Sequence, residues 1–131
     1  MKRLAVFFTF YLLAILGCSV SNEQELIGKY NANYDFAHEV LVLKSDHLFE
    51  QTVRMKNTNV EIVHSGTWTL SRDKRLVNLQ DPLIVEGEFG ARRDDWRQPV
   101  RGVWALRVDR TLRDLSLNWN DDRDVRFVQE R

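Results

Sequence analysis

The chain has 131 residues, enough for one domain. Its 19 Lys and Arg residues balance 19 Asp and Glu residues, which excludes the strongly basic surface of a typical nucleic-acid-binding protein. With Cys18 as its only cysteine, the chain cannot form an internal disulfide. We therefore expect one small domain held together by its core, with Cys18 serving another purpose.

The N-terminus has the pattern of a secretory signal. Met1-Lys2-Arg3 is positively charged, and residues 4–16 form an uncharged, strongly apolar run. A permanent transmembrane helix needs about 20 apolar residues, so this run is too short to remain as an anchor. We predict a cleaved leader over residues 1–17.

The end of this leader resembles the lipobox of bacterial lipoproteins, through Ile15-Leu16-Gly17-Cys18-Ser19. In such proteins a small residue precedes a cysteine that becomes the lipid-modified N-terminus. The resemblance implies a diacylglycerol thioether and an N-acyl chain on Cys18, which together suffice for stable anchoring. The alternative is an ordinary signal peptide cleaved near Ser19 or Ser21.

The residues after Cys18 are short and polar as far as Glu25. We predict residues 18–25 as a tether between lipid and domain, and residues 26–131 as the folded domain. The lipoprotein interpretation implies a domain in the periplasm of a bacterial cell envelope, anchored to the outer rather than the inner membrane.

The rest of the chain alternates apolar and polar residues in short runs separated by turns. The clearest run, residues 60–70, places His64, Gly66 and Trp68 on one face. Gly66 leaves room beside Trp68 for a neighbouring ring or for backbone curvature. In chain order we predict strands over residues 27–32, 38–44, 48–56, 60–70, 75–80, 83–89, 102–108, 114–119 and 123–129.

About nine such strands, with no helical period after the leader, predict an all-β fold. We expect an antiparallel up-and-down barrel or a sandwich of about eight to nine strands. The barrel is favoured because closure removes exposed strand edges. Trp68, Trp104 and Trp119 should all point inward.

Three short motifs in these strands resemble small lipocalin-like bacterial lipoproteins, a largely uncharacterised family: Leu41-x-Leu43-x-x-Asp46-x-x-Phe49, Gly66-x-Trp68-x-Leu70 and Val77-x-Leu79. The resemblance covers about residues 28–127. It implies positions in a barrel and no inherited active site. His47 stands where a glycine usually follows the turn aspartate.

The lipocalin-like pattern leads to the hypothesis that the barrel binds a small apolar ligand. His64, Trp68, Trp104 and Trp119 are the candidate ligand-binding residues, because all four should face the lumen. For His64 the alternative is a histidine held in the core by hydrogen bonds. For the lumen the alternative is a barrel filled by its own side chains.

A second hypothesis rests on residues 90–99, the longest gap in the strand pattern. Arg93, Trp96 and Arg97 have the composition of an interaction hot spot. The protein would then be an interaction module, an envelope adaptor or an inhibitor, with this loop as its contact. A solvated loop with locally paired charges and Trp96 packed on the barrel rim is equally compatible with these residues.

We predict no enzyme, no cofactor and no metal. The sequence has no G-x-S-x-G, P-loop or zinc-helix motif. Residues 118–124 alternate Asn and Asp with other residues, but Arg123 and Gln129 occupy the positions of the EF-hand glycine and glutamate. The histidines also lack the short spacing of a zinc site: His38, His47 and His64.

Overall fold

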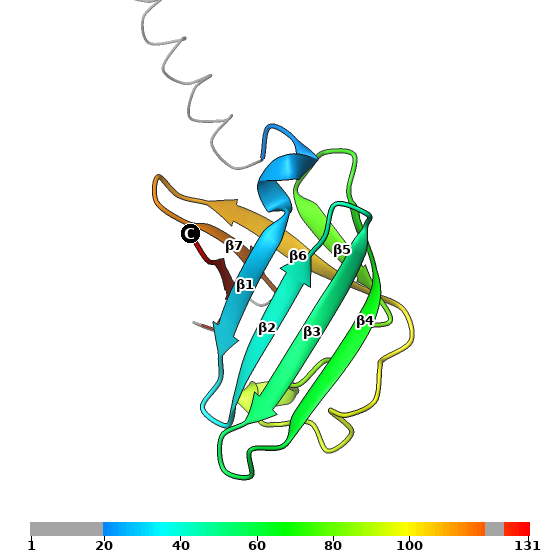
Figure 1. Ribbon diagram of the computed structural model, residues 1–131, viewed down its shortest axis with the longest axis vertical. Helices are drawn as coiled ribbons and strands as arrows, with labels where there is room; N and C mark the ends of the chain where they lie inside the picture. The colour runs from blue at the N-terminus through cyan, green and yellow to red at the C-terminus, as the bar shows by residue number, and fades with distance from the viewer. Residues whose placement is uncertain (1–19, 120–124) are drawn as a thin grey trace, which may run out of the picture.

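The computed structural model describes residues 20–119 and 125–131, which form a closed antiparallel β-barrel (Figure 1). Its strands follow one another around the barrel in chain order, and the last pairs with the first. This confirms the prediction of an all-β, up-and-down barrel. The strands are β1 (Gly28–Asn33), β2 (Ala37–Leu43), β3 (Leu48–Met55), β4 (Glu61–Leu70), β5 (Leu76–Gln80), β6 (Val103–Arg110), β7 (Leu115–Asn118) and β8 (Phe127–Gln129).

Alternation along the strands determines which side chains enter the barrel. In β3, Phe49 and Val53 are fully buried, whereas Arg54 is exposed. Gly66 of β4 faces Phe49 in the register, and a Cβ on Gly66 would lie 2.6 Å from the Phe49 ring. The glycine therefore makes room for a neighbouring ring, one of the two reasons expected from the sequence.

The predicted strand over residues 83–89 is wrong, and the described strands number eight. After β5 the chain leaves the barrel wall and runs as a long connection over residues 81–102, with one isolated bridge and the short helix η3 (Glu88–Gly90). Leu83 and Val85 in this connection are fully buried. The connection alternates because it turns apolar side chains inward, although it does not pair with a neighbouring strand. Periodicity alone does not distinguish such a segment from a paired strand.

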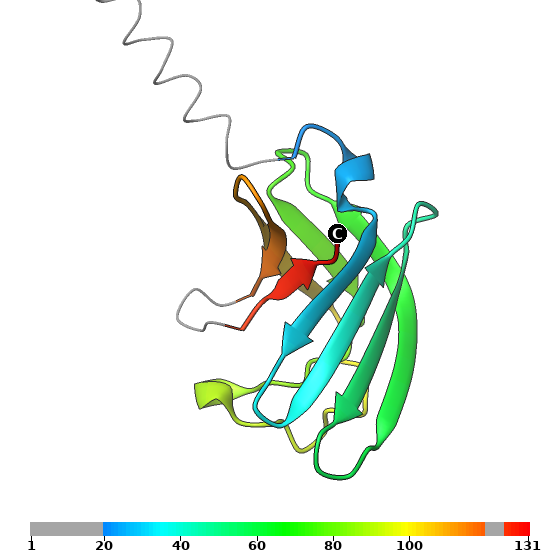
Figure 2. The same ribbon diagram turned by 60° about the vertical axis from the view of Figure 1, so that its left-hand side comes forward.

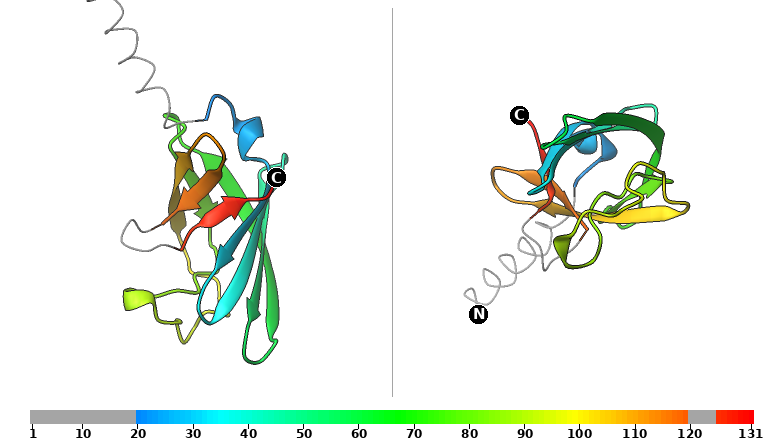
Figure 3. Two further views of the ribbon diagram at one scale, coloured as in Figure 1. Left: turned by 90° about the vertical axis from the view of Figure 1, so that its left-hand side faces the viewer. Right: turned by 90° about the horizontal axis from the view of Figure 1, so that it is seen from below.

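Different parts of the chain lie at the two ends of the barrel (Figures 1 and 2). At one end lie η2 (Glu23–Leu26) and the β2–β3, β4–β5 and β6–β7 turns; we call this the N-terminal end. At the opposite end, which we call the far end, lie the β1–β2 and β3–β4 turns and part of the 81–102 connection. Seen from the far end, the strands form a ring with η2 behind it (Figure 3).

The stretch predicted as a tether packs against the barrel from Val20 onward. Val20 is 1% exposed and Leu26 is fully buried. The Tyr30 hydroxyl donates a hydrogen bond of 2.7 Å to the Leu26 carbonyl, which fixes η2 over the barrel. Cys18 and its predicted lipidation lie outside the described residues. Within the part of the chain that the structure does describe, no helix is both long and apolar enough to span a membrane.

The β2–β3 turn keeps the backbone geometry that a glycine would adopt. His47 has φ 63°, in the left-handed region that favours glycine. Its Nε2 lies 2.8 Å from Glu23 Oε1, and its ring meets the Trp68 ring edge-on at 5.2 Å. With its backbone in this strained conformation, His47 contacts both η2 and β4.

Candidate functional site

Two of the four residues predicted for the lumen lie together, and two lie elsewhere. Trp104 and Trp119 meet at the far end, with ring centroids 5.4 Å apart. Trp68 lies near the N-terminal end, where its Nε1 donates a hydrogen bond of 3.0 Å to the Lys44 carbonyl. The Trp68 ring is 1% exposed and serves there as a core residue.

His64 lies at a seam in the barrel wall. β4 pairs with β5 only over Trp68–Leu70, so the first part of β4 has β3 as its neighbour on one side and a cleft on the other. The cleft has a volume of about 510 Å³ and is lined by His64, Gln80 and Arg101 among others. His64 Nε2 lies 2.8 Å from the Asp81 carbonyl oxygen, which makes it a hydrogen-bonded residue at the wall.

Trp104 and Trp119 belong to a larger group of rings, which we call the far-end aromatic cluster. The Trp119 ring contacts Trp104, Phe127 at 5.1 Å and Tyr34 at 5.9 Å, and Tyr34 stacks on Phe36 at 5.4 Å. Phe36, Trp104 and Trp119 are half-buried, while Tyr34 and Phe127 are buried. The cluster therefore extends from the solvent-accessible surface to the interior of the barrel.

A polar group lies at the buried edge of this cluster. Glu39 faces the interior from β2 and is fully buried, and Tyr34 is 2% exposed. Within residues 20–119 and 125–131, the Tyr34 Oη and both Glu39 carboxyl oxygens have no hydrogen-bond partner at good distance and angle, although Tyr34 and Gln51 lie near enough to Glu39 to affect its pKa by hydrogen bonding. Native structures rarely leave buried polar atoms in this condition.

The nearby Gln51 amide is already used by the backbone of the 81–102 connection. Its Nε2 donates to the Leu83 carbonyl at 2.9 Å, and its Oε1 accepts from the Leu83 N–H at 2.8 Å. This pair of hydrogen bonds holds the connection to β3.

Burial governs the protonation of the polar group. It raises the pKa of Glu39 to about 8, although hydrogen bonding from the Gln51 and Tyr34 side chains lowers it in part. Burial also raises the pKa of Tyr34 well above its usual range, and the carboxyl groups of Glu39 and Glu86 raise it further. At neutral pH, Tyr34 and Glu39 are therefore both neutral and each carries one O–H donor.

The predicted partner-binding residues lie on the 81–102 connection. Trp96 is 3% exposed, and the Arg97 guanidinium lies 5.4 Å from the centroid of its ring. Arg93 forms an ion pair with Asp95 at 3.2 Å. In this conformation Trp96 is a core residue, and Phe89 in the nearby η3 is the exposed aromatic at 98%.

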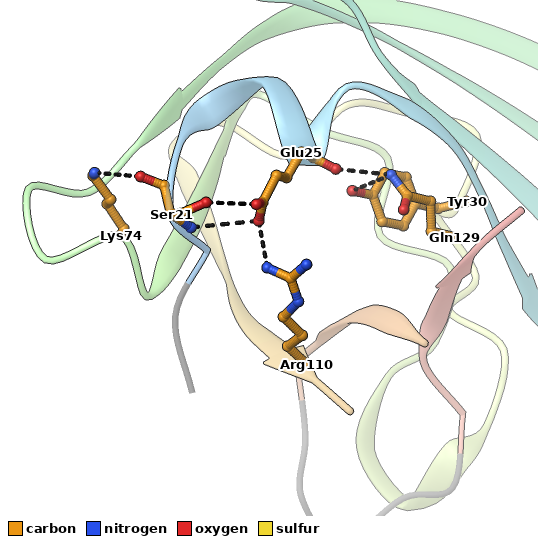
Figure 4. Close-up of polar contacts among 6 residues, drawn as sticks. All are labelled: Ser21, Glu25, Tyr30, Lys74, Arg110 and Gln129. Atoms are coloured by element: carbon orange, nitrogen blue, oxygen red, sulfur yellow. Dashed lines mark hydrogen bonds and ion pairs between the residues drawn. The ribbon is translucent and has the colours of Figure 1, made fainter. Parts of the chain in front are cut away.

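The N-terminal end carries a different polar network (Figure 4). Ser21 Oγ donates to Glu25 at 2.6 Å, and Lys74 donates to the Ser21 carbonyl at 2.9 Å. Glu25 also pairs with Arg110, and Gln129 donates to the Glu25 carbonyl at 3.0 Å. The Ser21 hydroxyl, followed by the Arg110 charge, lowers the pKa of Glu25. The contacts with Lys74, Arg110 and Gln129 join the N-terminal segment to three different parts of the barrel.

Among the described residues, no three His, Cys, Asp or Glu side chains converge in a way that could hold a metal ion. Of the Asn and Asp run that begins at Asn118, residues 120–124 lie outside the described part of the chain. Comparisons with protein-family models, with curated proteins and with solved structures give no match. The far-end aromatic cluster and the adjoining Tyr34–Glu39 pair are therefore identified as a candidate site by their geometry alone.

Proposed function

We propose that this protein is a membrane-anchored lipoprotein of the bacterial envelope whose barrel binds a small, largely apolar ligand at its far end. The ligand contacts Trp104 and Trp119, and its inner end reaches Tyr34 and Glu39. The lipocalin-like motifs support a barrel of this type. The remaining arguments concern the far end itself.

The unpartnered atoms of Tyr34 and Glu39 carry this proposal. Leaving one buried polar group unsatisfied costs about 1–3 kcal/mol. Apolar side chains at both positions would avoid that cost, so the pair favours a function over a purely structural role. A ligand that enters through the half-buried rings of the aromatic cluster gains apolar contacts and provides the missing hydrogen bonds.

The docked N-terminal segment gives the proposal an orientation. Cys18 precedes the buried Val20 by two residues, a reach of at most about 7 Å in an extended chain. A lipid on Cys18 would hold the N-terminal end of the barrel close to the bilayer surface. The far end, with its aromatic cluster, would then face away from the membrane and take its ligand from the periplasm.

Native mass spectrometry tests the ligand. The mature chain with Cys18→Ser, exported to the periplasm and purified without detergent, is expected to carry a discrete extra mass that is lost on denaturation. Trp119→Ala should reduce the fraction that carries this mass, whereas Phe89→Ala, a change in an exposed ring, should not. If the two variants carried the extra mass in equal fractions, the result would count against the far-end site.

Metabolic labelling tests the anchor separately. The full-length protein is expected to incorporate labelled palmitate and to sediment with membranes, and Cys18→Ala should lose both properties. Labelling that survives this substitution would remove the lipoprotein interpretation and leave the ligand proposal intact.

A protein-interaction function is the second candidate, and Phe89 favours it. This ring is 98% exposed and has φ 56°, an unusual backbone conformation for a large residue. Arg93 and Arg97 lie on the same connection, so a partner surface here would combine Phe89 with these guanidinium groups. Loss of a captured envelope protein on Phe89→Ser, with unchanged ligand mass, would support this second function.

A further inference from the structure

The Tyr34–Glu39 pair combines two side chains from neighbouring elements at one buried position. Tyr34 comes from the β1–β2 connection, and Glu39 faces inward from β2. Their three side-chain oxygens have no hydrogen-bond partner at good distance and angle within residues 20–119 and 125–131. Tyr34 and Glu39 do lie near enough to affect each other's pKa by hydrogen bonding. The Tyr34 ring is also part of the far-end aromatic cluster, through contacts with Phe36 and Trp119. The polar pair therefore adjoins the aromatic cluster against which the proposed ligand would lie.

The groups around the pair limit what it can bind. Gln51 makes two hydrogen bonds to the Leu83 backbone, and the second N–H of its amide is left to interact with Glu39. Glu86, from the 81–102 connection, is the other carboxyl group that acts on Tyr34. Lys56 contacts this region through the Tyr34 carbonyl oxygen at 2.6 Å, a main-chain contact. In the described part of the chain, no cationic side chain pairs with the Glu39 carboxyl.

A neutral carboxylic acid beside a tyrosine hydroxyl carries two O–H donors, and one of them stays free for an outside oxygen even when the two groups hydrogen-bond to each other. In apolar surroundings such a pair binds a carbonyl or similar oxygen strongly, because neither donor has to give up water when the ligand arrives. An ammonium group would require an ionised Glu39 and would bring a second charge out of water. Ordered water would satisfy the same atoms without any ligand.

We infer that the ligand of the far-end site presents a hydrogen-bond acceptor, a carbonyl or hydroxyl oxygen, to the hydroxyl of Tyr34 and the carboxylic acid of Glu39. This inference rests on the proposed ligand-binding function and specifies its chemistry. The ligand class is a small apolar body with one neutral oxygen-bearing end. Such a ligand stabilises the protonated form of Glu39, so its affinity is constant at neutral pH and falls when Glu39 ionises.

Three probes with one aromatic body test this inference: 2-acetylnaphthalene, 2-ethylnaphthalene and 1-(2-naphthyl)ethylamine. They differ at the end group, which is a carbonyl, an alkyl group or an amine. Binding is measured by tryptophan fluorescence and calorimetry between pH 6 and pH 9. The protein is the mature chain with Cys18→Ser, which keeps the whole barrel and the docked segment from Val20 onward.

The acetyl probe is expected to bind about tenfold more tightly than the ethyl probe at pH 6–7, the equivalent of one or two added hydrogen bonds. This preference should decline above pH 8. Glu39→Gln, which keeps a donor but does not titrate, should retain part of the preference at every pH. Glu39→Met should bind both probes equally.

Each contrary outcome identifies which claim fails. Equal binding of the acetyl and ethyl probes by the unsubstituted site would overturn the acceptor inference and leave the proposed function standing. Tighter binding of the amine, increasing with pH, would overturn it in favour of an ionised Glu39. No binding of any probe would overturn both, and ordered water would then account for the buried oxygens.

Discussion

The polar groups at the two ends of the barrel differ in their hydrogen bonding. At the N-terminal end, Ser21, Glu25 and Arg110 satisfy one another at the surface and tie the segment before β1 to the barrel. At the far end, the Tyr34 hydroxyl and the Glu39 carboxyl lie buried without a hydrogen-bond partner of good geometry in the described part of the chain. The first arrangement helps to hold η2 against this end of the barrel. The second leaves stability unrealised at the position proposed for a ligand.

The largest expected effect concerns the N-terminal closure. Leu26 of η2 is fully buried, so Leu26→Ala leaves a cavity and should lower the free energy of unfolding by about 2–5 kcal/mol. Denaturant titration measures this loss. At temperatures where the variant stays folded, its probe affinity should match that of the parent protein. A large loss of affinity would mean that the two ends are coupled.

A second effect is the pH dependence that the buried acid imposes. The folded pKa of Glu39 is about 8 against an ordinary 4.5, so between these values the folded state holds a proton that the unfolded state has released. Stability should therefore fall as pH rises, by about 2–3 kcal/mol between pH 5 and pH 7. Glu25, Asp73, Asp81 and Glu130 have lowered pKa values, so their contributions are lost at more acidic pH.

The matched control for this pH effect is Glu39→Gln, which should flatten the profile in that window. Denaturant midpoints measured across the pH range for both proteins provide the comparison. A parent profile as flat as that of the variant would mean that the acid is solvated or paired.

A third prediction is that removing the buried acid at the far end raises stability and weakens ligand recognition. Glu39→Met replaces an unpartnered acid with an apolar side chain of similar length and should raise the free energy of unfolding at pH 7 by about 1–3 kcal/mol. The same change should remove the preference for the acetyl probe. Gln51→Met is the contrasting control, because it leaves the Leu83 N–H and carbonyl without partners and should destabilise. Destabilisation by Glu39→Met would show that the carboxyl is satisfied in solution.

The smallest expected effect lies in the surface network at the N-terminal end. Glu25 pairs with Arg110 where both side chains are partly exposed. Glu25→Ala should therefore lower the free energy of unfolding by no more than about 1 kcal/mol. High salt should reduce the difference between variant and parent. A loss as large as that of Leu26→Ala would indicate that the surface network, and not Leu26, holds η2 in place.

Much of the barrel could be predicted from the sequence, because strands with one buried face repeat every two residues. That period correctly places Trp104 inward, and it places Glu39 on the same face as Leu41 and Leu43. It does not distinguish residues 83–89 from a paired strand, because this buried connection also alternates. Nor does it locate Trp96, since arginine and tryptophan in a loop are compatible with both an exposed and a packed ring.

The candidate site could be predicted only in part. Trp104 and Trp119 were identifiable as inward-facing residues, and the structure brings them together. The polar pair depends on long-range contacts that no local pattern contains. Gln51, the amide nearest to this pair, binds the backbone of Leu83, which lies 32 residues further along the chain. Contacts between residues so far apart in the sequence form only when the barrel closes.

Hydrogen exchange of the mature chain, with and without 2-acetylnaphthalene, tests the contrast between the two ends most directly. We predict that the probe slows exchange in residues 33–39 and in the 81–102 connection, and leaves residues 20–26 and the β2–β3 turn unchanged. Slowed exchange at the N-terminal end, or equally throughout the barrel, would contradict a ligand site at the far end.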